Sequence, residues 1–160
     1  MSTSDVGSNE LLLTRVFNAP RKLVWEVWTS AEHMPNWLPP HGFSLRVEAN
    51  DFRPGGKWRY IMIGNGVEFP CEGVFQEIVP YERYVSTDGF PEGVEGVDRS
   101  KLPGTMMVAT IFEDIGDKTR VTIRIMHPTL EDKRRHEEMG VIAGWESTFG
   151  NLDRYLATLV

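Results

Sequence analysis

The residue types that carry most enzyme chemistry are few in this sequence and stand far apart. Its four histidines are His33, His41, His127 and His136, and none of their spacings is that of a zinc-binding H-E-x-x-H pair. There is no P-loop, no G-x-S-x-G motif and no C-x-x-C pair. Cys71 is the only cysteine, so it has no partner for an internal disulfide, and we expect a buried, unreactive thiol. We therefore predict no metal site and no bound cofactor.

Two side chains are candidates for proton transfer. His127 ends a run of inward-facing residues on a predicted strand, and histidine exchanges protons readily near neutral pH. Glu72 lies on a middle strand, as Glu48 and Glu77 do, and a carboxylate directed into a cavity can act as a general acid or base. A one-residue slip of register moves every side chain to the other face, so which carboxylates point inward stays open. The alternative for His127 is a strand-end histidine bonded to backbone or solvent.

Aromatic residues are distributed over the segments that should face one another in the fold. Some of them can line an internal cavity, while packing in an ordinary core is the alternative for each one. Any indole N–H or phenol O–H in a cavity needs a hydrogen-bond partner, which a ligand or a water can supply. The residues that we predict to line a ligand cavity are Trp37, Trp58, Tyr60, Met62, Trp145, Phe149 and His127.

The elements that must position these residues follow from periodicity. Alternating apolar residues predict strands at 10–17, 43–52, 57–63, 67–78, 82–87, 105–114 and 119–128. Asn65-Gly66 predicts a tight hairpin between two of them. Residues 21–38 have helical spacing interrupted by Pro35, which indicates a helix and then a short second one. The glycine-rich segment 88–104 is predicted to be a long loop, either a lid over a cavity or a surface insertion.

Residues 130–160 have helical periodicity to the end of the chain, which predicts one long terminal helix. Its apolar face needs a partner, and a twisted antiparallel sheet is the only large apolar surface available. We interpret Gly144 and Gly150 as small residues that let the sheet approach the helix closely or let the helix bend. The residues of the apolar face are Ile142, Trp145, Phe149, Leu152 and Leu156.

Length and composition favour one soluble domain, and antiparallel strands with helices that are not interleaved make it α+β. The chain has 160 residues, 41% of them hydrophobic, and a net charge of -6, which works against binding to nucleic acid or an anionic membrane. No apolar run reaches the length of a membrane-spanning helix, and no secretory signal begins the chain, so we expect a cytoplasmic protein. We predict a disordered tail at 1–9 and a single domain at 10–160, as a monomer or a homodimer.

Several blocks of sequence, in this order and spacing, carry a resemblance to a known family. They are RVFNAPRKLVWEVWTSAEHMPNWLPPHGF, RPGGKWRY, GVFQEIVPYERYVST, FEDIGDKTRVTIRI and GWESTFGNLDRYL. The chain resembles the START-like (SRPBCC, helix-grip) superfamily, and within it the single-domain relatives of the activator of heat-shock-protein ATPase. The resemblance implies an antiparallel sheet of about seven strands around the C-terminal helix, with an elongated cavity for lipids, sterols, polyketides or other apolar molecules.

Three functions remain open at this stage. The first is a binding protein for a small apolar ligand, such as a lipid, held between the sheet and the terminal helix. The second is an enzyme of the cyclase, dehydratase or hydrolase type that uses the same cavity, with His127 or Glu72 transferring the proton. The third, implied by the resemblance alone, is an interaction protein that regulates a chaperone in the stress response.

Overall fold

The computed structural model describes residues 2–5, 9–90 and 102–160 of the chain. One antiparallel sheet dominates it, with strand order β1-β2-β8-β7-β6-β5-β4-β3. The strands are β1 (Ser2–Asp5), β2 (Glu10–Phe17), β3 (Ser44–Asn50), β4 (Lys57–Gly64), β5 (Val67–Val79), β6 (Arg83–Asp88), β7 (Met106–Ile115) and β8 (Lys118–Met126). The helices are α1 (Arg21–Thr29), the short 3-10 helix η1 (Met34–Asn36), α2 (Leu130–Glu138) and α3 (Val141–Ala157).

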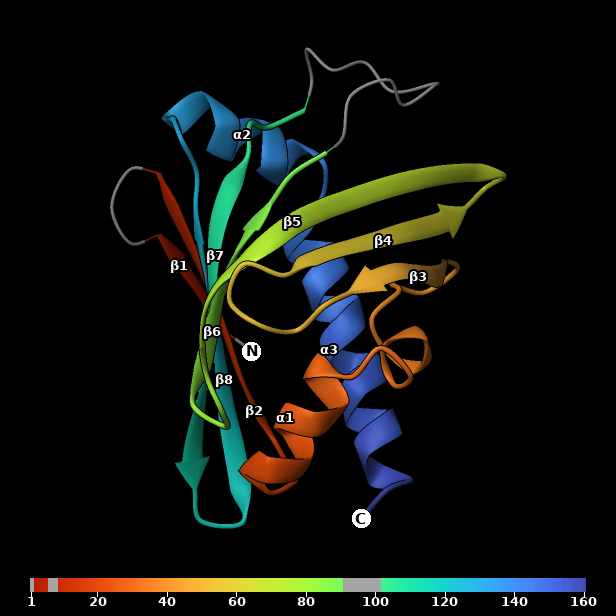
Figure 1. Cartoon of the computed structure of the whole chain (residues 1–160), viewed down its shortest axis with the longest axis vertical. Coiled ribbons are helices and arrows are strands. Elements are labelled where there is room, and N and C mark those ends of the chain that lie inside the picture. The colour runs from red at the N-terminus through yellow and green to blue at the C-terminus, as the bar shows by residue number, and fades with distance from the viewer. Residues whose placement is uncertain (1, 6–8, 91–101) are drawn as a thin grey trace.

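The sheet curves around α3, as Figure 1 shows, with α1 beside the lower part of that helix. This is the predicted α+β helix-grip fold. Strands β2 to β8 are the seven that the sequence indicates. The structure adds β1, which pairs with β2 from Ser2↔Thr14 to Asp5↔Leu11. The prediction of a disordered tail at 1–9 is therefore wrong for Ser2–Asp5, because the outer edge of β2 offers backbone groups that a further strand can pair with.

The hairpin between β4 and β5 forms where the sequence predicts it. Asn65 and Gly66 have φ angles of 54° and 73°, as a type I′ turn requires. The turn sets a register in which Tyr60 lies opposite Cys71 and Trp58 lies opposite Gly73. Since side chains alternate along a strand, Trp58, Tyr60 and Met62 share one face of β4.

The terminal helical region is two helices rather than the single one predicted. α2 ends at Glu138, and Gly140 has a φ of 85°, a left-handed conformation that glycine adopts without a Cβ clash. Gly144 and Gly150 are not points of close contact with the sheet. A Cβ at Gly144 would meet nothing within 4 Å, and one at Gly150 would meet only the Arg154 side chain at 3.7 Å. The interpretation that these two glycines admit a close approach of the sheet is therefore wrong.

The main core lies between the sheet, α1 and α3. Phe17 packs edge-on against Trp28 and Phe149, with ring centroids 6.2 Å and 5.7 Å away. Leu152 and Leu156 of α3 are buried in the same cluster.

Among the described residues, no helix has the length and apolarity needed to cross a membrane. β6 continues one residue into the predicted 88–104 loop, whose possible role as a lid lies outside the described residues because it depends on 91–101.

Candidate functional site

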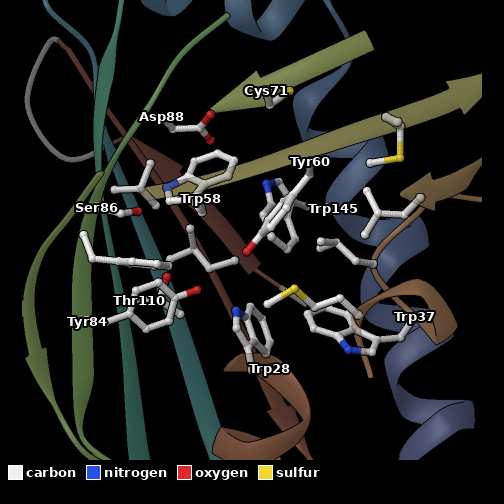
Figure 2. A pocket seen from close by; sticks show the side chains of 17 residues that line it. Trp28, Trp37, Trp58, Tyr60, Cys71, Tyr84, Ser86, Asp88, Thr110 and Trp145 are labelled. Carbon is white, nitrogen blue, oxygen red and sulfur yellow. The ribbon is translucent and has the colours of Figure 1, made fainter. Parts of the chain in front are cut away.

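A cavity of about 200 Å³ lies between the inner face of the sheet and the helical side of the molecule. Its lining is mostly aromatic or aliphatic, and six polar side chains interrupt it (Figure 2). The rings around it are Trp28, Trp37, Trp58, Tyr60, Phe75, Tyr84 and Trp145. The polar groups come from Tyr60, Cys71, Tyr84, Ser86, Asp88 and Thr110.

The tryptophans are held by contacts within the protein. The Trp37 indole N–H donates to the Val27 carbonyl oxygen at 3.1 Å, and the Trp58 indole N–H donates to the Thr87 carbonyl oxygen at 3.2 Å. Trp28 stacks on Trp145 with ring centroids 6.1 Å apart. Trp37 and Trp58 therefore need no ligand to satisfy their N–H groups, and they present apolar ring surface to the cavity.

Five of the predicted lining residues are placed along this cavity by the structure. They are Trp37, Trp58, Tyr60, Met62 and Trp145. Phe149 is not among the lining residues; it is fully buried in the core, where it packs against Phe17 and lies beside Trp145. The aromatic stripe of α3 is thus divided between cavity and core within one helical turn.

His127 lies away from the cavity. It is buried, and its Nδ1 is 2.8 Å from the Asn9 carbonyl oxygen, so this nitrogen carries a hydrogen. Its Nε2 is 3.0 Å from Nδ1 of His136 on α2. Burial, and then the neighbouring His127, lower the pKa of His136 to about 4. This placement corresponds to the alternative of a strand-end histidine bonded to backbone. The sequence did not predict that α2 is a separate helix that packs against His127.

The predicted strand carboxylates face outward. Glu72 pairs with Arg59, which also donates to the Glu48 carboxylate at 2.8 Å. Glu77 pairs with Arg83 at 2.7 Å. All three carboxylates belong to exposed ion pairs. Glu72 follows Cys71 on β5, so its side chain lies on the face of the sheet opposite Tyr60 and Cys71. None of them lines this cavity, so none is placed to act on a molecule bound inside it.

The carboxyl group that does reach the cavity is Asp88, at the last position of β6. Figure 2 shows it beside Trp58, on the same side of the cavity as Ser86. Burial raises its pKa from 3.8 to about 7. The neighbouring residue fixes its position, because Thr87 accepts the Trp58 N–H at its carbonyl oxygen and a hydrogen bond from the Val74 N–H at its Oγ1.

Asp88 was missed because the sequence places it in the glycine-rich loop. A signal was nonetheless present, since Tyr84, Ser86 and Asp88 are spaced by two and so share one face of an extended strand. Thr110 joins them from β7, where it lies opposite Tyr84. Polar residues at these positions look solvent-facing in a sequence, which is why this inward set is difficult to recognise.

The other titratable groups of the cavity are held neutral. Burial, and then the nearby Asp88, raise the pKa of Cys71 to about 12, so the thiol is protonated at neutral pH. Burial also raises the pKa of Tyr60, and it raises that of Tyr84 to about 12 against the effect of hydrogen bonds with Thr110 and Trp28. Among the described residues, no group of three or more histidine, cysteine, aspartate or glutamate side chains is arranged to hold a metal ion.

Comparison with known proteins places this fold and site in a family. The sequence profile described as "Activator of Hsp90 ATPase homolog 1-like protein" matches residues 18–157, most of the chain. The chain belongs to this family. The Activator of Hsp90 ATPase homolog 1-like match covers the elements from α1 to α3 that surround the cavity. No match is found among curated proteins.

Solved structures of bacterial proteins agree with this membership. The chain is similar to a protein from Nitrosomonas europaea, 29% identical, over 96% of this chain and 97% of the other, with a TM-score of 0.80. It is similar to a protein from Arthrobacter aurescens, 25% identical, over 98% and 91%, with a TM-score of 0.87. A protein from Mycobacterium smegmatis, 22% identical over 100% and 99%, shares the fold with a TM-score of 0.87. Fold and family are those of a general ligand-binding domain.

Proposed function

We propose that this protein binds a small, mainly apolar molecule in the cavity between its sheet and α3. The observation that carries the proposal is the cavity itself, about 200 Å³ in volume and lined chiefly by rings and aliphatic chains. Apolar cavities of roughly 150 Å³ already bind benzene-sized molecules in other proteins. A single ring with a short side chain is therefore the size class that fits.

The state of the lining supports binding of an apolar body. The indole N–H groups of Trp37 and Trp58 donate to backbone carbonyl oxygens, so a ligand needs to contact only their apolar ring faces. Burying apolar ligand surface against such rings yields roughly 25 cal/mol per Å² removed from water. The few polar groups then orient the molecule rather than supply most of the binding free energy.

The direct test is titration with an uncharged aromatic probe, phenethyl alcohol, followed by two-dimensional NMR of the labelled protein. We expect shifts concentrated at cavity residues. Val108→Phe adds a ring to a residue that lines the cavity and should weaken binding by about tenfold or more. Val16→Phe is the matched control, because Val16 is 45% exposed on β2 and away from the cavity lining. Equal binding by both variants, or a wild type that binds neither this probe nor its amine analogue, phenethylamine, would contradict the proposal.

The physiological ligand can be sought in the same framework. Protein purified from its own source is weighed by native mass spectrometry and then extracted with organic solvent. A compound released in near-stoichiometric amount identifies the chemical class, and loss of that compound from Val108→Phe but not from Val16→Phe assigns it to the cavity.

An acid–base enzyme is the second candidate, and Asp88 is the observation that favours it. A carboxyl group with its pKa raised to about 7 exchanges protons efficiently near neutral pH, and it reaches the cavity. This residue replaces His127 and Glu72 as the candidate proton-transfer group. Incubating the extracted compound with wild-type protein and with Asp88→Asn, and looking for a new mass, tests it: turnover should be lost in the variant, and an unchanged compound argues against the enzyme.

A further inference from the structure

The polar side of the cavity carries one acidic group and no basic one among the described residues. Asp88 is the only described residue of the lining that can bear a full charge near neutral pH. Tyr60 from β4, Cys71 from β5 and Tyr84 from β6 are the titratable groups around it, and raised pKa values keep all three neutral. The charge that the described lining residues can carry near neutral pH is therefore negative.

The Asp88 carboxyl makes no hydrogen bond and no ion pair with any residue that the structure describes. Buried carboxylates are ordinarily paired, because an unpaired charge loses its hydration without compensation. No described polar atom is sealed from solvent without a partner, so the Asp88 oxygens keep access to the cavity space. The partner that this carboxyl lacks can thus come from a bound molecule.

The rings next to Asp88 suit the same partner. Trp58 and Tyr60 lie 4.7 Å apart between ring centroids on β4, and Trp28 and Trp145, which also line the cavity, stack on each other. Aromatic faces attract cations through their quadrupole, and the attraction strengthens where water is excluded. Figure 2 shows these rings and the carboxylate facing a common space.

A neutral apolar ligand would meet a penalty in this site. It would displace water from the Asp88 carboxylate and offer no charge in return, so the group would have to take up a proton. A ligand with a protonated amine avoids this penalty, because its N–H groups donate charge-assisted hydrogen bonds to the carboxylate while its apolar body fills the ring-lined space.

We infer that the cavity selects a molecule with a compact apolar body and one protonated amine, the amine pairing with the Asp88 carboxylate. The inference rests on the proposed function and deepens it by naming the ligand class. Trp58 and Thr87 act as positioning residues, because the hydrogen bond between them fixes the strand end that carries Asp88.

The test compares two probes of nearly equal size, phenethylamine and phenethyl alcohol, at about pH 8, where the carboxyl is ionised. Binding is measured by tryptophan fluorescence and by NMR. The amine should bind at least about tenfold more tightly than the alcohol to the wild type. In Asp88→Asn that ratio should fall to about one, while the alcohol still binds. Asp114→Asn, an exposed aspartate on β7, is the matched control and should keep the wild-type ratio.

The outcomes separate the inference from the function beneath it. Equal binding of the two probes, or an amine preference that survives in Asp88→Asn, overturns the amine inference and leaves apolar binding standing. Failure of both probes to bind at any pH overturns the proposed function together with the inference. A preference for the amine that weakens as the pH falls below about 6, in the wild type only, supports the pairing with the carboxylate.

Discussion

Replacing Asp88 by asparagine should stabilise the protein, and only at high pH. Burial raises the pKa of this carboxyl from 3.8 to about 7. Between those two values the native protein holds a proton that the unfolded chain has released. Stability of the wild type is therefore lost as the pH rises through this range. Asparagine keeps the shape of the side chain and does not titrate, so Asp88→Asn escapes the loss.

The size of the effect follows from the pKa shift. About three pKa units at 1.36 kcal/mol each give an upper limit of about 4 kcal/mol. Of this, about 2–3 kcal/mol falls between pH 5 and pH 8. Asp88 keeps some accessible surface in the cavity, which reduces the value, so we expect a gain of about 2 kcal/mol or less for Asp88→Asn over that interval.

Urea denaturation followed by circular dichroism measures it, with both proteins at a series of pH values. The free energy of unfolding of the wild type is subtracted from that of Asp88→Asn at each pH, which removes contributions from groups that the two proteins share. Asp114→Asn, at an exposed position, is the control and should show a small difference with little pH dependence. A difference that stays constant from pH 5 to pH 8, or that favours the wild type at pH 8, would refute the reasoning.

Three further predictions concern other parts of the molecule. Gly144→Ala should raise the free energy of unfolding by about 0.5–1 kcal/mol, because a Cβ there meets nothing. Gly140→Ala should lower it by about 1 kcal/mol or more, because Gly140 has a φ of 85°. Denaturant melts that give the reverse order of stability would count against the helix assignment. His136→Gln should reduce the fall in the free energy of unfolding below pH 6.5. The pKa of His136 is lowered to about 4 in the native state, so between these pH values the unfolded chain binds a proton that the native protein does not. If the free energy of unfolding falls equally with pH in both proteins, this explanation is wrong. Glu72→Gln should change the free energy of unfolding by under about 1 kcal/mol and leave probe binding unchanged, because its ion pair is exposed; weaker binding in a fluorescence titration would place it in the site after all.

The fold could be predicted because local periodicity and turn residues mark each strand in the sequence. Alternation in KWRYIMI marks β4 and assigns its two faces, and Asn65-Gly66 fixes the next strand in register. The resemblance then supplies the arrangement of sheet and helix. The break at Gly140 was not readable, because the residues on both sides of it have helical periodicity and a left-handed glycine leaves no mark on that pattern.

The candidate site was readable only in its apolar half. Large rings at inward positions, such as Trp58 and Trp145, follow from strand and helix periodicity. Asp88 did not, because a polar residue beside Gly89 has the features of a loop, and only the pairing of Gly89 with Glu72 extends the sheet past it. His127 is buried, but it lies outside the predicted cavity lining, because the element that covers it depends on tertiary packing that sequence periodicity does not show.

β5 belongs to two parts of the sheet at once. Its residues 67–74 pair with β4, its later residues pair with β6, and the register shifts between Phe75 and Glu77. Such an irregularity bends and twists the strand that carries it. The width of the space beside Cys71 and Phe75 is therefore set partly by backbone geometry at one position. An insertion, a deletion or a glycine at this bend can accordingly change the size of the cavity while every side chain that lines it stays the same.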